Sequence, residues 1–241
     1  IVACIASEAL SASKVHTISL PSKYSSTHSL EDAVKLSKNL NVNHRVIKIN
    51  DLVDVYESSL NPHFHGTKVD VTEENIQARV RGNILMALSN KFNWLLLSTG
   101  NKTELALGYC TLYGDMSGSL SVISDLSKIQ VYKLAKWINE NYVDLIPENI
   151  INKPPSAELA DKQVDPFDYS IVSPMVDAII EKNTSPKDLI NSGSDKDLVM
   201  FIYNRIKSME YKRRQSPIGF KVSKKAFGIG RRIPIVNHFK G

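Results

Sequence analysis

An apolar segment that runs directly into a polar turn and a helix constrains the fold of this chain more than any other feature. Residues 95–97 are three leucines, and the turn and helix after them carry a hydroxyl at Thr99 and a carboxylate at Glu104. In an open α/β sheet, ligands bind where strands end and helices begin, because helix N–H groups without partners attract anions. Thr99 and Glu104 at such a junction suit a nucleotide phosphate and its Mg²⁺. An ordinary strand–helix turn, capped by Asn101 or Thr103, is the alternative explanation.

Strand-like and helical patterns alternate along most of the chain. The expected strands span residues 15–20, 44–49, 92–98 and a short segment at 120–123. The expected helices span residues 29–40, 51–60, 72 onward, 125–140, 173–182, 186–191 and 195–209. Residues 152–168 are expected to form a loop. This order predicts an α/β fold with a doubly wound parallel sheet and helices on both faces. Helices dominate after Asn152, so we expect a helical C-terminal extension. We find no internal repeat and expect one domain over residues 1–241.

Length and composition narrow the class of protein. A chain of 241 residues with 42% hydrophobic and 23% charged residues is typical of a globular domain with a large core. No apolar run approaches the roughly 20 residues that a membrane-spanning helix needs, and no secretory leader is visible. Cys4 and Cys110 have no metal-ligand spacing and form no disulfide framework, which fits a reducing compartment. We therefore expect a cytoplasmic protein with no membrane-embedded part.

The charge balance points to anionic partners. The formal net charge is +5, and cations gather late in the chain, at residues 212–214, 221–225 and 231–232. Three explanations for such a segment are open: a solvated tail, a site for a phosphate-rich small molecule, or a surface for an acidic protein. Nucleic acid ranks below these partners, because the basic residues are not interleaved with aromatic ones and no known nucleic-acid-binding module is visible.

The first residues begin inside an apolar helical pattern. The segment Ile1–Ala6 has no N-cap and no strand before it, so a helix that starts there leaves its first N–H groups without partners. We therefore expect the natural polypeptide to continue upstream of Ile1.

Several blocks along the chain form motifs in a consistent order. The blocks are residues 98–109, 111–118, 125–128, 154–159, 212–217 and 226–235. Together they resemble NAD synthetase, and more narrowly the synthetase domain of its glutamine-dependent form. The resemblance implies a Rossmann-like ATP pyrophosphatase fold. It also implies an upstream strand with a Ser-Gly-Gly-x-Asp-Ser loop for the ATP pyrophosphate, which this sequence does not contain, and an amidase domain upstream of both.

The resemblance implies a ligase. NAD synthetases activate the carboxylate of nicotinic acid adenine dinucleotide (deamido-NAD) with ATP, so that an acyl-adenylate forms and pyrophosphate leaves. Ammonia, either free or produced from glutamine, then attacks to give NAD and AMP. Because negative charge crowds at the triphosphate and the carboxylate, electrostatic stabilisation and positioning should contribute more than proton transfer. Neither Cys4 nor Cys110 lies in a recognisable Cys/His/Glu arrangement that could hydrolyse glutamine.

The motif matches imply an ATP site with Mg²⁺. Glu104 matches the metal-binding glutamate of the family, and Thr99, Lys128 and Ser156 match residues that contact ATP. Lys128 falls in the first turn of an expected helix, where a cation opposes the helix dipole and a bound anion would remove the conflict. Without the resemblance, a carboxylate suits a helix's first turn by charge alone, a lysine there can be solvated, and the hydroxyls of Thr99 and Ser156 suit local backbone contacts.

A second set of matches implies the deamido-NAD site. It consists of Arg79, Tyr211 and Lys212. A planar guanidinium suits a pyrophosphate or a carboxylate, although a solvated helix arginine explains Arg79 equally well. The small ammonia-dependent enzymes usually carry His at the position of Tyr211. In that form a lysine and an aspartate hold deamido-NAD where this chain has Leu112 and Ser119, so these two roles do not transfer.

Two other function classes stay open. Another ATP pyrophosphatase ligase, GMP synthetase-like or tRNA-modifying, shares the adenylation step but not the substrate; the ordered blocks favour NAD synthetase. A non-catalytic module that binds a dinucleotide or a sister subunit also fits a chain without the pyrophosphate loop. The family resemblance further implies a homodimer or a higher homo-oligomer.

Overall fold

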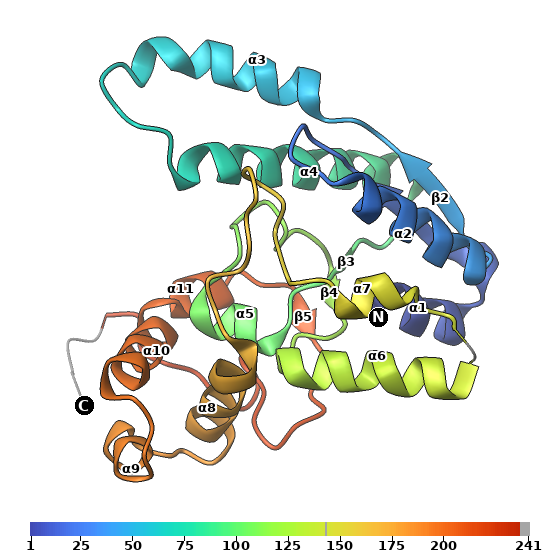
Figure 1. The fold of residues 1–241 in the computed structure, drawn as a ribbon. Helices are drawn as coiled ribbons and strands as arrows, with labels where there is room; N and C mark the ends of the chain where they lie inside the picture. Colours follow the sequence, from blue (N-terminus) through green and yellow to red (C-terminus); the bar gives the residue numbers. More distant parts are fainter. Residues whose placement is uncertain (143, 237–241) are drawn as a thin grey trace. The chain divides into compact units, whose positions relative to one another are not determined.

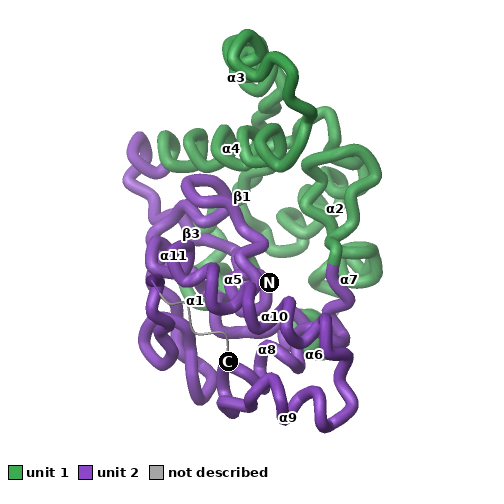
Figure 2. The backbone as a smooth tube through the Cα atoms, turned by 90° about the vertical axis from the view of Figure 1, so that its left-hand side faces the viewer, with its two compact units in different colours: residues 1–88, 132–166 green, residues 89–131, 167–241 purple. Residues whose placement is uncertain are grey.

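The structure is a computed structural model, and it describes residues 1–142 and 144–236 (Figure 1). The chain divides into two compact units, coloured separately in Figure 2. Unit 1 comprises residues 1–88 and 132–166, and unit 2 comprises residues 89–131 and 167–241. Within the described residues, no helix combines the length and the apolarity that a membrane span requires.

Unit 1 contains a two-stranded parallel sheet and several helices. Strand β1 (His16–Ser19) pairs with β2 (Asn43–Val46), with His16 opposite Asn43. The helices are α1 (Val2–Leu10), α2 (Thr27–Asn39), α3 (Asn50–Leu60), α7 (Glu148–Asn152) and most of α4 (Val71–Phe92) and α6 (Lys128–Tyr142), with 3₁₀ turns at Ala12–Lys14 and Asn61–His63. The two strands expected in this part of the chain are thereby confirmed.

Two apolar clusters form the core of unit 1. The first cluster connects α1 and the end of α2 with α6 and consists of the buried residues Cys4, Leu40, Ala135, Ile138 and Ile146. The second connects α3 with α4 and consists of Ile49, Val53, Ile76 and Val80. Cys4 therefore packs as a small apolar residue, as free cysteines commonly do.

Unit 2 contains a three-stranded parallel sheet in the order β3-β4-β5. The strands are β3 (Leu97–Ser98), β4 (Leu120–Ser121) and β5 (Ile218–Gly219). The helices are α5 (Lys102–Leu107), α8 (Tyr169–Glu181), α9 (Pro186–Asn191), α10 (Lys196–Ser208) and α11 (Glu210–Arg213). One core cluster connects α5 with α8, α9 and α10, and its fully buried members include Leu107, Val176, Ile180, Ile202 and Ile206. The helix after the strand–turn junction therefore packs into the centre of this unit.

The parallel pairing and the alternation of strands with helices confirm the expected α/β fold class. Helices α8 to α11 confirm the helical C-terminal extension. The short elements α7, α11 and β5, of five, four and two residues, were not predicted, because no periodic pattern develops over so few positions. That residues 1–241 form one domain stays a prediction.

Two helix starts differ from the sequence-based expectation because of side-chain contacts. Helix α2 begins at Thr27 rather than at residue 29, because the Ser26 hydroxyl accepts a hydrogen bond from the Ser29 N–H and acts as the N-cap. Helix α4 begins at Val71, because the Asp70 carboxylate accepts from the Thr72 N–H. Both helices thus begin upstream of the expected positions.

Several further boundaries are wrong by three or more residues. Helix α8 begins at Tyr169 rather than at residue 173, because the Asp168 carboxylate accepts from the Ser170 N–H and caps the helix there. Strand β2 ends at Val46 rather than at residue 49. Helix α4 continues to Phe92, so the expected strand at 92–98 is reduced to Leu97–Ser98. Helix α6 begins at Lys128 rather than at Asp125. The Asp125 carboxylate does not cap that helix, because it accepts hydrogen bonds from the backbone of residues 222–223.

Candidate functional site

The first turn of α5 is closed by a reciprocal capping box. Asn101 Oδ1 accepts from the Glu104 N–H at 3.1 Å, and Glu104 Oε2 accepts from the Asn101 N–H at 3.1 Å. This pair satisfies two of the N–H groups that a helix start leaves without partners. Of the two caps that the sequence allowed for this turn, Asn101 and Thr103, the structure has Asn101, and this cap orients the Glu104 side chain.

Glu104 and Lys128 meet at this turn. The Lys128 ammonium lies 2.9 Å from Glu104 Oε1, and the two side chains are 17% and 19% exposed. The Lys128 backbone N–H donates to Thr103 Oγ1, and its ammonium lies 5.0 Å from the centre of the Tyr169 ring. Lys128 is a cation at the positive end of the α6 dipole, which is unfavourable. The negative charge of the Glu104 carboxylate offsets this.

The same carboxylate can still coordinate a cation. An ionised carboxylate has about four lone-pair positions, and the contacts of Glu104 with Asn101 and Lys128 occupy two of them. Among residues 1–142 and 144–236, no group of three or more His, Cys, Asp and Glu side chains could hold a metal ion. Mg²⁺ needs no such cage, because it commonly binds through one or two carboxylates together with substrate phosphates and water. Glu104 therefore fits Mg²⁺ delivered with a nucleotide.

The other ATP candidates lie on exposed segments. Thr99 is exposed directly after β3, in unit 2. Ser156 belongs to unit 1, where its hydroxyl donates to the Gln163 carbonyl and accepts from the Glu158 N–H. The hydroxyl of Ser156 thus makes the local turn contacts that its sequence context also allowed.

The deamido-NAD candidates are likewise divided between the units. Arg79 is exposed on α4, in unit 1, whereas Tyr211 and Lys212 lie on α11, in unit 2. The Lys212 ammonium donates to the carbonyls of Gly108 at 2.9 Å and Cys110 at 2.6 Å, where α5 ends. Lys212 thus stabilises the carboxyl end of α5, and its third N–H is available to a ligand.

The end of α5 requires glycine. Gly108 has a φ of 65°, and a Cβ atom there would lie 2.3 Å from two side-chain atoms of Met209. A side chain at this position would therefore be strained by the positive φ and would force the Met209 side chain to move.

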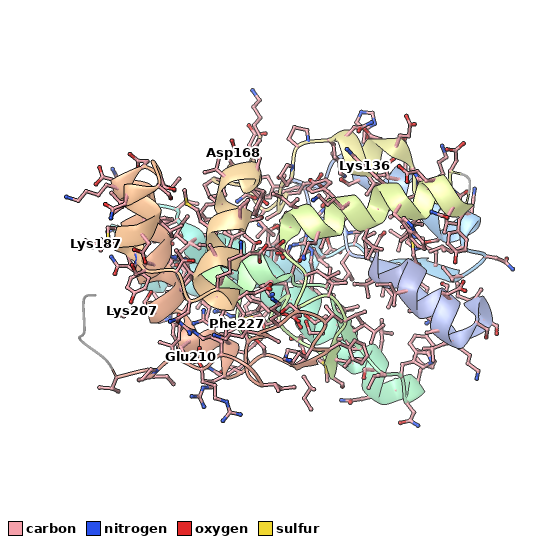
Figure 3. All side chains as sticks on the ribbon, turned by 90° about the horizontal axis from the view of Figure 1, so that it is seen from below. Lys136, Asp168, Lys187, Lys207, Glu210 and Phe227 are labelled. Carbon is pink, nitrogen blue, oxygen red and sulfur yellow. The ribbon has the colours of Figure 1, made fainter. Side chains whose placement is uncertain are left out.

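Helix α11 supports α5 through a buried ion cluster. Glu210, which is 2% exposed, accepts from Arg213 Nε at 3.1 Å and from Arg214 Nε at 2.8 Å. Arg213 also donates to the carbonyl of Leu105 and lies over the Phe227 ring at 4.5 Å. Figure 3 labels Glu210 and Phe227 in this part of the molecule. The basic residues 212–214 therefore have a structural role in addition to any role in binding.

Asp115 and Cys110 are polar groups near Glu104 to which the sequence-based analysis assigned no role. Burial, with the Glu104 charge as a smaller cause, raises the pKa of Asp115 to about 6, although part of this residue stays open to solvent. Asp115 Oδ1 accepts from the Thr111 N–H. Burial also raises the pKa of the Cys110 thiol to about 12, which disfavours the reactive thiolate form at neutral pH. The Gly-Asp step of the block at 111–118 was the available signal for Asp115.

Comparisons with known proteins show which family the chain is similar to. The family model for NAD synthase matches residues 1–216. A glutamine-dependent NAD(+) synthetase from Synechocystis sp. is 46% identical over 242 residues, which cover 99% of this chain and 43% of that protein. The structure is similar to glutamine-dependent NAD+ synthetase from Acinetobacter baumannii in complex with ADP, with a TM-score of 0.63, 39% identity, and coverage of 98% of this chain and 43% of the other.

A shorter relative matches over more of its own length. The NH3-dependent NAD synthetase from Campylobacter jejuni has a TM-score of 0.67 and 29% identity, and the match covers 85% of this chain and 77% of that one. The present chain spans less than half the length of its glutamine-dependent relatives. Because the family model matches residues 1–216 of 241, the chain belongs to the NAD synthase family.

Proposed function

We propose that this chain carries the synthetase activity of a glutamine-dependent NAD synthetase. In this activity ATP and deamido-NAD form an acyl-adenylate and release pyrophosphate, and ammonia then gives NAD and AMP. The observation that supports it most directly is the contact between Glu104 and Lys128 at the carboxyl end of β3, within a chain of this family. The relative bound to ADP supports an adenine nucleotide as a ligand of this fold.

Lys128 is proposed to bind the ATP phosphates. Its ammonium is held near the start of α6 by the contacts with Glu104 and Tyr169, so it does not need to be reoriented when charge develops on the departing pyrophosphate. A cation placed in advance at developing negative charge stabilises the transition state more than the ground state. Lys128 thus supplies electrostatic stabilisation rather than a proton.

Glu104 is proposed to hold Mg²⁺. When bound, the metal ion would offset the charge of the triphosphate. Glu104 also orients Lys128 through the 2.9 Å ion pair, so the two side chains are expected to act as one unit. Thr99 and Ser156 are proposed as further ATP contacts.

Arg79, Tyr211 and Lys212 are proposed to bind deamido-NAD. Arg79 suits the dinucleotide pyrophosphate, because a guanidinium can donate two parallel hydrogen bonds to phosphate oxygens. Lys212 can reach a ligand while it keeps its two carbonyl partners at the end of α5. Tyr211, which is 40% exposed, is the least constrained of the three.

Ammonia is proposed to come from glutamine through an amidase domain in a longer polypeptide, or from solution. Glutamine hydrolysis by this chain does not fit its cysteines, because burial raises the pKa of both the Cys4 and the Cys110 thiol. A cytoplasmic location and a homodimer or higher homo-oligomer belong to the same proposal.

The deciding experiment supplies the intact protein with ATP, Mg²⁺, ammonium and deamido-NAD, and measures pyrophosphate and NAD. We expect pyrophosphate release that depends on deamido-NAD and not on xanthosine monophosphate. Release with xanthosine monophosphate alone would instead indicate a GMP synthetase-like ligase. Calorimetric binding of deamido-NAD without any amide formation would indicate a non-catalytic binding module.

A further inference from the structure

Lys102 lies completely buried beside the candidate ATP site. It is the first residue of α5, and its side chain is 0% exposed. Its ammonium lies 2.8 Å from Asp125 Oδ1, 2.8 Å from Glu181 Oε1 and 2.9 Å from Ser223 Oγ. Each of the three ammonium protons can therefore have an acceptor, and the three acceptors come from three separate segments of unit 2.

Asp125 connects this ammonium to the C-terminal segment. Its Oδ2 accepts from the N–H groups of Val222 and Ser223, both at 2.7 Å, and its Oδ1 accepts from the Ser223 hydroxyl at 2.8 Å. Asp125 is 2% exposed. Although burial opposes ionisation, the hydrogen bonds from Lys102 and Ser223 lower the pKa of Asp125.

The charge of the cluster depends on Lys102. Asp125, Glu181 and Asp177 are three carboxyl groups near one ammonium, and burial raises the pKa of Asp177. A buried carboxylate that loses its cation destabilises its surroundings strongly, because it keeps the cost of desolvation without the attraction. Removal of the Lys102 charge would therefore drive the segments that carry these acids apart.

The same turn carries the candidate ATP site. The Lys102 N–H donates to the Leu126 carbonyl at 2.8 Å, and the adjacent Thr103, which is 0% exposed, accepts from the Lys128 N–H. Glu104 follows one residue later in the same helical turn. The position of Glu104 relative to Lys128 is thus set in part by the contacts of Lys102 and Thr103 with residues 126–128.

We infer that Lys102 is a positioning residue for the adenylation step: its buried ammonium ties α8 and the C-terminal segment to the turn that holds Glu104 and Lys128 at ion-pair distance. This inference rests on the proposed function. Lys102 itself touches no substrate, because all of its donors point into the protein. Its effect on the reaction passes through the geometry of the Glu104–Lys128 pair, in which a displacement of about 1 Å can cost about a hundredfold in rate.

Lys102→Met tests this inference in the intact protein, since it keeps the side-chain length and removes the charge. We expect the half-saturating concentration of Mg²⁺·ATP for pyrophosphate release to rise about tenfold or more, with a smaller change for deamido-NAD. Leu189→Ala is the control, because Leu189 is 8% exposed in the core of unit 2 and belongs to a different cluster. It should lower the unfolding temperature and leave both half-saturating concentrations unchanged.

Ser223→Ala provides a milder variant in case Lys102→Met does not fold. It removes one acceptor of Lys102 and one donor to Asp125 at a part-buried site, and we expect the half-saturating Mg²⁺·ATP concentration to rise about threefold. Hydrogen exchange at the Val222 and Ser223 amides should accelerate in both variants. If the folded variants keep the half-saturating Mg²⁺·ATP concentration of the wild type, the inference is overturned. Absence of pyrophosphate release by the wild type would overturn the proposed function instead.

Discussion

The first turn of α5 and the loop at residues 153–166 both carry candidate ATP contacts, but the protein holds them differently. In the turn, Asn101, Lys102 and Thr103 are 3%, 0% and 0% exposed, and their polar groups bond to several segments of unit 2. In the loop, Ser156 is exposed and bonds within the loop itself. The turn is therefore organised before a ligand arrives.

Polar contacts with other segments of unit 1 hold the loop. Gln77 donates to the Leu159 carbonyl at 2.9 Å, Gln163 donates to the Glu74 carboxylate at 3.0 Å, and one loop carboxylate accepts several further hydrogen bonds. Glu158 accepts from the Ser26 N–H, the Ser26 hydroxyl and the Ser29 hydroxyl, at the start of α2 in the same unit. The loop has few buried apolar residues of its own, so its order rests on these polar contacts. Variants of the turn should thus affect the chemistry, and variants of the loop should affect local order.

The largest effect is expected for Lys128→Met. This change removes the cation at the start of α6 and leaves Glu104 without its ion-pair partner. We expect pyrophosphate release in the intact protein to fall by about a hundredfold to a thousandfold, since preorganised charges at a reacting phosphate contribute on that scale. Lys133→Met, at an exposed position five residues later on the same helix, serves as the matched control. Unaltered pyrophosphate release would exclude Lys128 from the reaction.

Glu104→Gln should have the next largest effect. The amide keeps the shape of the side chain but binds Mg²⁺ weakly, so the Mg²⁺ concentration at half-maximal rate should rise by about ten- to a hundredfold. A titration of rate against Mg²⁺ at constant ATP measures this shift. An unchanged metal dependence would count against Glu104 as a metal ligand.

Arg79→Ala should act on one substrate. Arg79 is exposed on α4, so its loss should leave the fold intact and raise the KM for deamido-NAD about tenfold, with the KM for ATP within about twofold. Steady-state kinetics with each substrate varied separately would detect the difference. A larger effect on ATP than on deamido-NAD would reject the assignment.

Glu158→Gln should have the smallest effect, confined to the loop. Burial opposes ionisation, but hydrogen bonds from Ser29 and Ser26 lower the pKa of Glu158 below its ordinary value of 4.5. A lowered pKa means that this contribution to loop order is present above pH 4.5 and is lost as the pH falls through the lowered value. Hydrogen exchange of residues 153–166, corrected for its intrinsic pH dependence, should rise a few-fold in the wild type over that range. In the variant, hydrogen exchange of this loop should already be fast at pH 7. If the variant instead shows the same dependence of exchange on pH as the wild type, Glu158 does not have this role.

Most elements could be predicted because their signals are local. Helix α9 spans Pro186–Asn191 as expected, since Ser185 and Pro186 form a recognisable helix start. Strand β3 was predicted too long because residues 94–97 are an apolar run, and short apolar runs do not distinguish a strand from the segment after a helix. The start of α2 was misplaced by two residues because several neighbouring serines could each serve as its N-cap.

The candidate site was predictable to the extent that it lies in contiguous motifs. Asn101 and Glu104 lie in one short segment, so the sequence alone allowed a cap at Asn101 and a carboxylate in the first turn of the helix. The contact between Glu104 and Lys128 was not visible in spacing, since 24 residues separate them. The family motifs assigned both residues to one candidate site. In the fold, the Lys128 ammonium lies 2.9 Å from Glu104 Oε1.

The order of strands and helices, the capped turn after β3 and the family of the chain followed from the amino-acid sequence, because periodicity, capping and motif order are properties of neighbouring residues. The tertiary structure alone decided that Lys102 is buried among Asp125, Glu181 and Ser223. Lys102 and Ser223 stand 121 residues apart, and no local pattern distinguishes a buried lysine from a solvated one. Burial and long-range partners arise when distant segments pack together, and those contacts hold the chemical groups of this site in place.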